Sequence, residues 1–394
     1  MTAPPPSYLE RVAPFIDPMT AWRRALHALP ELSYAESQTA DLVAQTLAEQ
    51  GLSVHRGLAG TGVVGTLHGR HLGERAIGLR ADMDALPIQE INDLPHASRH
   101  PGVMHACGHD GHTAMLLGAA CALAHSRDFA GTVHFIFQPA EEGRGGARKM
   151  IDDGLFRLFP VEAVYGLHNW PELPAGVFAV HPGPVMAACD AFTISIRGCG
   201  GHAAMPHQTV DPVLIAGHVL TAAQSLISRS TNPFESAVVS VTRLEAGTAF
   251  NVIPDEARLW GTIRSFDPTT RRMLHDKLDR LVAHIAAAFG AEAQLVIEPR
   301  ASATINHRSE AERAAQAAAL VVGADKVVRD LQPAMTAEDF GDLLNVVPGA
   351  YLWLGQGNDR APCYLHQPDY DFNDAVLGVG AAFWLALVES LLAP

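Results

Sequence analysis

Residues 104–112 concentrate side chains that bind metal ions. The run reads Met-His-Ala-Cys-Gly-His-Asp-Gly-His, so Cys107, His109 and His112 surround two glycines. Thiolate and imidazole are the ligands that a borderline-soft divalent ion prefers. Because glycine allows tight backbone turns, these side chains can converge on one point. The run therefore predicts a metal site.

Further candidate ligands follow apolar runs that are typical of strands. They are the adjacent carboxylates Glu141 and Glu142, His168 in Gly-Leu-His-Asn-Trp-Pro, and His366 in Tyr-Leu-His-Gln-Pro. A lone cysteine such as Cys107 is commonly a small buried core residue. With four other candidate ligands in the chain, metal binding is favoured over packing.

The paired carboxylates suit a division of labour at a metal site. Glu141 and Glu142 would repel each other unless a cation absorbed their charge. One carboxylate can bind the ion while the other acts as general base towards the attacking water and then as acid for the leaving amine. The alternative is a solvated acidic turn before the flexible run of residues 143–146.

Residues around the ligands are expected to orient them. Asp82 and Asp84 are two apart at the end of a predicted strand, so both point to the same side. One of them is expected to accept a hydrogen bond from the second ring N–H of a ligand histidine. For the other, a purely structural role in the loop is an almost equally good interpretation. His105 and His112 are expected to pack or hydrogen-bond beside the site rather than to bind the ion.

Composition narrows the class of protein. The 394 residues are 48% hydrophobic and 18% charged, which is enough for one large core or two smaller ones. A net charge of -14 argues against nucleic acid, and no polybasic run suggests a membrane surface. A small-molecule substrate is therefore expected.

Three features predict a cytoplasmic protein. The N-terminal residues lack the charged and apolar segments of a secretory signal. Five cysteines, an odd number, fit a reducing compartment better than a disulfide framework. The longest apolar stretch, Ala375 to Val388, is too short for a bilayer and predicts a core-facing terminal helix.

Hydrophobic periodicity predicts an α/β fold with an insertion. Residues 1–182 alternate helical and strand patterns, and this alternation resumes over residues 300–394, for example in an expected helix at 337–344. Residues 183–299 instead follow the order βαββαβ of a ferredoxin-like unit. We therefore predict a discontinuous catalytic domain, residues 1–182 and 300–394, that carries an inserted domain of residues 183–299.

Six motifs together resemble the M20 metallopeptidase superfamily, and more narrowly its amidohydrolase branch of hippurate hydrolases, N-acyl-amino-acid deacylases and plant auxin-conjugate hydrolases. They recur in order along nearly the whole chain: Arg80-Ala-Asp-Met-Asp-Ala-Leu-Pro87, Met104 to Ala114, Gln138-Pro-Ala-Glu-Glu142, Gly166-Leu-His168, Gly247-Thr-Ala-Phe-Asn-Val-Ile-Pro254, and Leu365-His366 to Asp374.

The resemblance implies two divalent ions per subunit, bridged by Cys107. His109 and His168 would complete one site, and Glu142 and His366 the other. Glu141 would be the general acid/base. Zinc, manganese, cobalt and nickel all suit this mixture of nitrogen, oxygen and sulfur ligands.

The resemblance also implies roles for the inserted domain, which would be a dimerisation and lid domain on a mixed-sheet, metallopeptidase-like catalytic domain. His202 in Gly200-Gly-His202 would reach the partner subunit's active site and polarise the scissile carbonyl. Asn251 and Arg264 would hold the substrate's carboxylate, for which a guanidinium is suited. Without the resemblance they would be interpreted as a turn asparagine and a strand-end surface arginine.

These observations predict a homodimeric or dimer-based metal-dependent amidohydrolase that cleaves N-acyl amino acids of the hippurate or N-acetyl type. A dipeptidase or aminopeptidase of the same superfamily is the alternative. A cysteine amidase with Cys107 as nucleophile and a catalytically silent ligand-binding relative are further alternatives. Retention of Glu141 beside Glu142 argues against the silent relative, because a pure binder needs no spare carboxylate.

Overall fold

The computed structural model describes residues 6–357 and 364–394. Two compact units make up the chain. The first comprises Met1–Val185, Ile305–Gln332 and Asp339–Pro394, and the second comprises Met186–Thr304 and Pro333–Glu338. Residues 1–5, which belong to the segment interpreted as lacking a signal, and Cys363 lie outside the described residues; the four described cysteines are free thiols.

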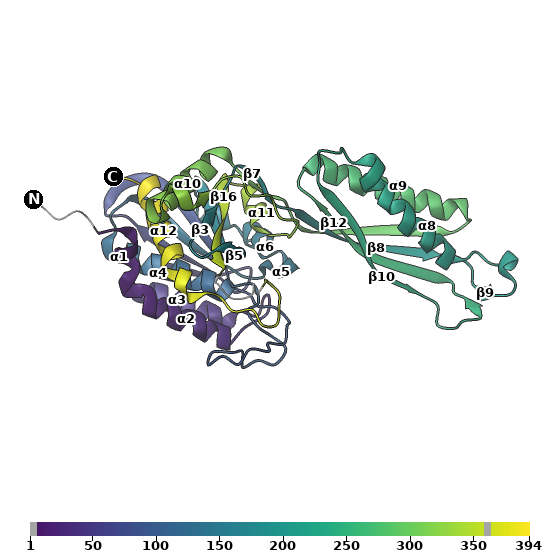
Figure 1. The fold of residues 1–394 in the computed structure, drawn as a ribbon, viewed down its shortest axis with the longest axis horizontal. Helices are drawn as coiled ribbons and strands as arrows, with labels where there is room; N and C mark the ends of the chain where they lie inside the picture. The colour runs from purple at the N-terminus through teal and green to yellow at the C-terminus, as the bar shows by residue number, and fades with distance from the viewer. Residues whose placement is uncertain (1–5, 358–363) are drawn as a thin grey trace, which may run out of the picture. The chain divides into compact units, whose positions relative to one another are not determined.

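A mixed eight-stranded sheet forms the centre of the first unit, with the strand order β1-β2-β4-β3-β5-β16-β6-β15 (Figure 1). The central pairs β4/β3, β3/β5 and β5/β16 are parallel, whereas β1/β2, β2/β4 and β16/β6 are antiparallel. The predicted mixed sheet is confirmed. The strands are β1 (Ser53–Leu58), β2 (Gly62–His68), β3 (His71–Asp82), β4 (Ala130–Gln138), β5 (Ala163–Pro174), β6 (Phe178–Ala179), β15 (Val327–Val328) and β16 (Gly349–Gly357).

Helices of the first unit pack around α4, which is buried on every side and contacts α2, α3, α12 and β3. This burial explains why α4 is apolar all round instead of amphipathic. The helices are α1 (Tyr8–Val12), α2 (Ile16–Ala28), α3 (Ser37–Glu49), α4 (His109–Ser126), α5 (Glu141–Arg144), α6 (Gly146–Asp152), α7 (Leu155–Leu158), α10 (Arg308–Val322), α11 (Phe340–Leu344) and α12 (Leu377–Leu391).

The C-terminal helix α12 belongs to the core of this unit. An 18-residue window, Asp374–Leu391, is long and apolar enough to cross a membrane, which corrects the expectation from sequence that this stretch is too short. However, 72% of the window is buried inside the protein. The helix packs on α10, α4 and α1, as expected for a core helix.

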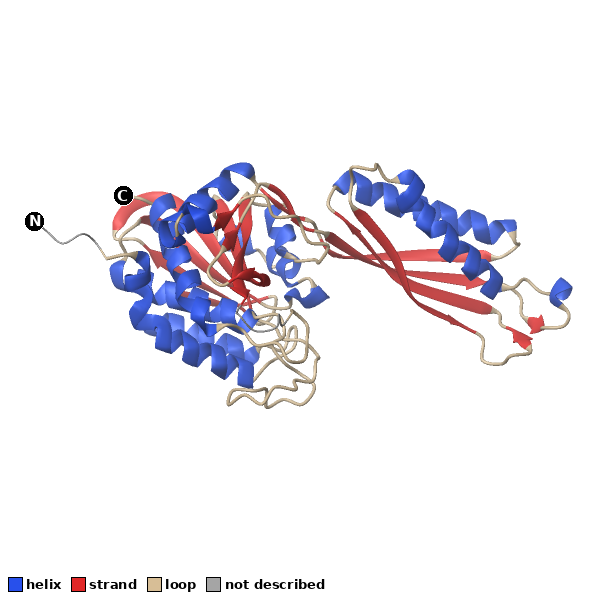
Figure 2. Cartoon of the chain, in the orientation of Figure 1, coloured by secondary structure: helices blue, strands red, loops and turns tan. Residues whose placement is uncertain are grey.

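The second unit has the predicted ferredoxin-like order, which Figure 2 shows as two helices over one sheet. Its antiparallel sheet has the order β10-β12-β8-β13. Helices α8 and α9 each begin after an aspartate N-cap followed by proline at the first helical position. The elements are β8 (Ala188–Arg197), α8 (Pro212–Ser225), β10 (Ala237–Ala246), β12 (Glu256–Ser265), α9 (Pro268–Ala288) and β13 (Glu292–Ala301).

Shorter elements complete the chain. Two-residue strands β9 (Gly201–His202) and β11 (Val252–Ile253) pair with each other, and β7 (Gly183–Met186) pairs with β14 (Thr304–Asn306). Single turns of 3-10 or π-helix span Ala13–Phe15, Pro206–Gln208, Leu226–Ser230, Ala324–Lys326 and Asp374–Val376.

One predicted element is shorter than expected. The helix expected over residues 337–344 begins only at Phe340. The preceding residue, Asp339, uses its buried carboxylate to accept hydrogen bonds from Gln138 Nε2 (2.7 Å) and the Ala147 N–H (2.9 Å). These bonds tie the residue before α11 to β4 and α6.

Candidate metal centre

The candidate ligands gather at the carboxyl ends of the parallel strands. Asp82 ends β3, Glu141 follows the end of β4, and His168 lies within β5. Because β4, β3 and β5 are neighbours with one direction, residues far apart in sequence meet at one edge of the sheet. His109 opens α4 after Gly108, whose φ is 93° and at which a Cβ would lie 2.3 Å from Asn169 Oδ1.

Cys107 belongs to two groups of potential ligands. In each group the donor atoms all lie within 4.8 Å of one another. The first group is Cys107, His109 and His168, and the second is Cys107, Glu142 and His366. Cys107 Sγ is 3.4 Å from His168 Nε2, and His366 Nε2 is 3.4 Å from Glu142 Oε1. All five residues selected from the sequence as ligands therefore lie together.

The chemistry of the donors fits a divalent cation. Among the described residues, His109 Nε2 and Glu142 Oε1 are buried and have no hydrogen-bond partner. Leaving such atoms unpaired in the interior costs about 1–3 kcal/mol each, and more for a charged group. A cation of the zinc type would satisfy both, along with the Cys107 sulfur.

Hydrogen bonds to the backbone orient both ligand imidazoles. His109 Nδ1 donates to the Asp84 carbonyl (2.8 Å), and His168 Nδ1 donates to the Asn169 carbonyl (2.7 Å). Each ring therefore presents the lone pair of Nε2 to the site. A carboxylate was expected to orient the ligand histidine, but the Asp84 carboxylate is 3.4 Å from His109 Nδ1 and its backbone carbonyl takes the shorter contact.

Asp82 and Asp84 have different tasks. The Asp82 carboxylate accepts hydrogen bonds from His112 Nδ1 (2.6 Å) and Arg80 Nη1 (2.7 Å). The Asp84 carboxylate accepts the N–H groups of both Glu141 and Glu142, each at 3.0 Å. Asp84 therefore fixes the turn that carries the two glutamates.

Glu141 lies beside the ligands. Its Oε2 is 4.0 Å from His109 Nε2. Within the described residues, the two ligand groups that contain Cys107 leave Glu141 out, whereas Glu141 forms other potential groups with His109 and Glu142 and with Glu338 and Asp339. This position fits a carboxylate that handles protons next to an ion.

Burial and neighbouring charges shift the pKa values of the cluster. Burial alone would lower the pKa of His109, but Asp82 and Cys107 outweigh it and raise that pKa well above its ordinary value. Burial, with the nearby imidazoles of His112 and His109, lowers the pKa of His168 well below its ordinary value. Burial and the Glu142 charge raise the pKa of the Cys107 thiol. A bound cation would favour the thiolate and the neutral imidazoles.

The remaining predicted residues belong to the second unit. Val252 pairs with His202, and the Ala203 N–H donates to the Asn251 carbonyl (3.1 Å), so His202 and Asn251 share one small ribbon. Arg264 lies towards the opposite end of β12, about 26 Å along the strand from Glu256, the strand residue that follows the ribbon. Arg264 and the ribbon that holds Asn251 therefore lie towards opposite ends of β12.

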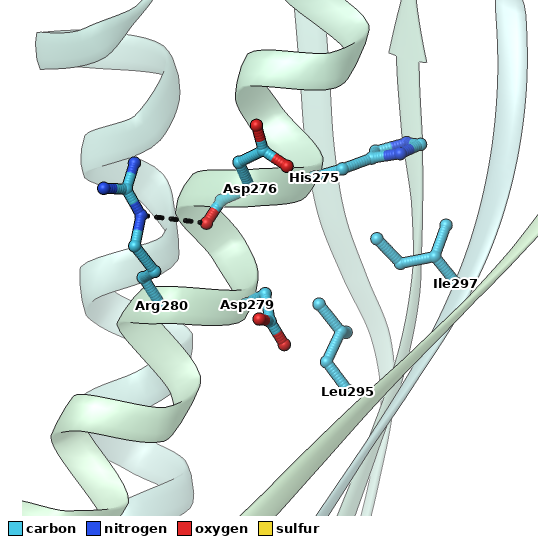
Figure 3. Close-up of a pocket in the computed structure, with 6 residues that line it drawn as sticks. All are labelled: His275, Asp276, Asp279, Arg280, Leu295 and Ile297. Carbon is cyan, nitrogen blue, oxygen red and sulfur yellow. Dashed lines mark hydrogen bonds between the residues drawn. The ribbon is translucent and has the colours of Figure 1, made fainter.

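A separate hollow of about 640 Å³ lies against α9 in the second unit (Figure 3). None of the predicted site residues lines it; its lining residues are His275, Asp276, Asp279, Arg280, Leu295 and Ile297. His275 Nε2 donates to the buried carboxylate of Asp190 (2.8 Å), which Arg271 also binds. This histidine is therefore engaged in a structural hydrogen bond.

The residues that form a hydrogen-bond network next to the ligands were not predicted from the sequence. Asn169 Nδ2 donates to Tyr370 Oη (2.8 Å), and Gln356 Nε2 donates to the same oxygen (3.0 Å). These side chains connect β5, β16 and the segment after His366. Their polarity inside otherwise apolar runs was the available signal, but their partners are distant in sequence.

Comparison with known proteins agrees with this geometry. The family model described as peptidase family M20/M25/M40 matches residues 78–390. The chain belongs to this family. It is thus a metal-dependent hydrolase, and the expected family resemblance is confirmed.

Two relatives and one solved structure illustrate the similarity within the M20 family. The hippurate hydrolase of Campylobacter jejuni is 41% identical, with 94% of this chain and 95% of the relative covered. An N-acetylcysteine deacetylase of Bacillus subtilis is 39% identical, with 94% and 96% covered. The crystal structure of the Bacillus subtilis protein YXEP, described as a dinuclear metal binding peptidase, is 36% identical with a TM-score of 0.83, covering 96% and 99%.

Replacing Cys107 by serine tests the shared ligand. A hydroxyl is a much poorer ligand for a borderline-soft ion than a thiolate, so metal affinity should fall at one or both positions. The measurement is metal content after dialysis against a weak chelator. Cys121→Ser is the matched control, because this buried free thiol lies on α4 about 18 Å beyond His109. A Cys107→Ser protein that retains metal as the parent does would contradict the shared-ligand geometry.

Proposed function

We propose that this M20 protein hydrolyses the amide bond of N-acyl amino acids and releases a carboxylic acid and a free amino acid. The observation that carries the proposal is the cluster around Cys107, in which two ligand groups share one sulfur while Glu141 lies beside them. The hippurate hydrolase and N-acetylcysteine deacetylase relatives support the substrate class.

Two divalent ions would be held here, one by Cys107, His109 and His168 and the other by Cys107, Glu142 and His366. When bound, such ions polarise the substrate carbonyl and lower the pKa of the attacking water. The donor set suits zinc, manganese, cobalt or nickel.

Glu141 moves the proton. In this proposal its carboxylate takes a proton from the attacking water as oxygen bonds to the carbonyl carbon. The carboxylic acid then gives that proton to the amide nitrogen as the carbon–nitrogen bond breaks. The burial of Glu141 beside His109 supports this role, because the carboxylate is close to the candidate ligands and largely shielded from bulk solvent.

His202 is assigned to stabilise the negative charge on the carbonyl oxygen. The Ala204 N–H donates to His202 Nδ1 (3.0 Å), so in the neutral ring the proton is on Nε2. An exposed Nε2–H is a suitable donor for a developing oxyanion.

We further propose that each active site uses two subunits of a dimer. Arg264 and Asn251 both match positions for the substrate carboxylate, yet Arg264 lies about 26 Å along β12 from Glu256, the first residue of this strand after the ribbon that holds Asn251. Arg264 Nη1 is buried and has no hydrogen-bond partner among the described residues, which supports a ligand there. Exposed apolar side chains on α8, Val213, Leu214 and Leu220, support a partner surface in the same unit.

A substrate panel with metal removal tests the activity. N-benzoyl and N-acetyl amino acids should be hydrolysed, and their α-methyl esters should be poor substrates, because the free carboxylate is needed by the guanidinium. A chelator should abolish turnover and added metal should restore it. Preference for dipeptides with a free amine would favour the peptidase alternative, and activity that survives chelation would favour a Cys107 nucleophile.

Adjacent glutamate variants separate the two proposed carboxylate roles. Glu141→Ala should keep its metal and lose roughly 10²–10⁴-fold in kcat, because the residue acts on water and not on the ion. Glu142→Ala should lose metal as well as activity. Metal analysis and kinetics on both proteins check this. A Glu141→Ala protein that has lost an ion would make Glu141 a ligand instead.

Mixing two inactive variants tests the shared site. Glu141→Ala and His202→Ala proteins should each be nearly inactive, but a mixed dimer has one site with both residues intact. Random exchange makes about half of the dimers mixed, so activity should approach about a quarter of the parental value. Demonstrated subunit exchange without recovery would mean that His202 acts in its own chain or has no catalytic part.

A further inference from the structure

Glu36 is a buried carboxylate whose hydrogen bonds reach a distant part of the chain. It immediately precedes α3, and its Oε1 accepts the Ala140 N–H at 2.9 Å. The same oxygen accepts the Tyr34 N–H (2.9 Å), and Oε2 accepts the Thr61 hydroxyl (2.7 Å).

The bond to Ala140 falls at a strained position of the catalytic turn. Ala140 is a fully buried non-glycine residue with φ of 57°, in the left-handed region. Such a conformation persists only when surrounding contacts hold it. Ala140 directly precedes Glu141, so its conformation sets the direction in which the two glutamates leave the strand.

Neighbours of Glu36 contact the same turn. Tyr34 Oη donates to the Arg144 carbonyl (2.9 Å), beyond the glutamates. The Ser33 hydroxyl donates to Asp84 (2.8 Å), the carboxylate that accepts the N–H groups of Glu141 and Glu142. Residues 33–36 therefore contact the turn at Ala140 and at Arg144. They also contact Asp84, which holds the middle of the turn.

Three successive backbone N–H groups thus end on two buried carboxylates. Ala140 N–H bonds to Glu36, and the next two bond to Asp84. Without the Glu36 carboxylate, the Ala140 N–H would be left unpaired in the interior. The turn could then relax to an ordinary conformation and shift Glu141.

We propose that Glu36 is a positioning residue for amide hydrolysis, which fixes the Glu141–Glu142 turn through the Ala140 N–H. The kinetic part of this inference rests on the proposed function. Glu36 acts on the backbone behind Glu141 and not on the substrate. A misplacement near 1 Å at a reacting group can cost about 10²-fold in rate.

The test compares Glu36→Ala, Glu36→Gln and a control, Glu310→Ala. Glu310, on α10, is also a buried carboxylate of the first unit, but it accepts a hydrogen bond from the hydroxyl of Tyr165 on β5 (2.5 Å). With saturating metal, Glu36→Ala should lower kcat by about 10–100-fold with little change in KM. Glu36→Gln should keep most activity, because its amide oxygen still accepts the Ala140 N–H. Glu310→Ala should lower the thermal midpoint while kcat stays near the parental value.

Amide hydrogen exchange gives a readout that needs no substrate. Peptides covering residues 138–145 should exchange faster in Glu36→Ala than in the parent or in Glu36→Gln. The inference is overturned if kcat and exchange in Glu36→Ala match the parent, or if the variant loses only thermal stability as Glu310→Ala does. A parent that hydrolyses no N-acyl amino acid refutes the proposed function, while the exchange data still test Glu36.

Tyr34→Phe covers the case in which Glu36→Ala does not fold. This variant loses only the hydroxyl that bonds to the Arg144 carbonyl, and the ring is partly exposed. We expect a several-fold lower kcat and faster exchange over residues 143–145. Parental values for both measurements would overturn the role of the segment.

Discussion

Two buried carboxylates, Asp84 and Glu36, support the backbone that presents the candidate acid/base and one candidate ligand. A carboxylate in the interior needs hydrogen-bond donors, and a strained turn needs fixed acceptors. Here each requirement satisfies the other, because the N–H groups of residues 140–142 are the donors. The backbone of Glu141 and Glu142 is thereby fixed. Their two negatively charged side chains can therefore stay close together although their charges repel each other.

Backbone groups also orient the imidazole rings of the two candidate ligand histidines. His109 and His168 are oriented by carbonyl groups of their own neighbourhood, at Asp84 and Asn169. Carbonyl acceptors add no net charge to a site that already contains a thiol and several carboxylates. Among the described residues, His109 Nε2 and Glu142 Oε1 have no hydrogen-bond partner, and they mark where a cation would bind.

The candidate substrate residues of the second unit lie in two places. The unit has its own core, Arg264 lies near the end of β12, and His202 and Asn251 lie at the small ribbon of β9 and β11. β12 separates Arg264 from the ribbon of His202 and Asn251. Recognition of one substrate carboxylate by both Arg264 and Asn251, as proposed, would therefore need two chains. The separation of these residues along β12 is therefore the observation that supports the assembly of two chains.

The sequence by itself determined the family, the mixed α/β layers, the βαββαβ insertion and the list of candidate ligands. The fold and the insertion follow from local hydrophobic periodicity. The family and the ligands follow from motifs such as the run from Cys107 to His112, whose residue types indicate metal binding. Only the tertiary structure decided which acceptor orients His109, where the helix before Leu344 begins, and that Glu36 holds Ala140. Each of these depends on contacts between segments tens to hundreds of residues apart, and a buried carboxylate looks the same in sequence as an exposed one until its donors are known.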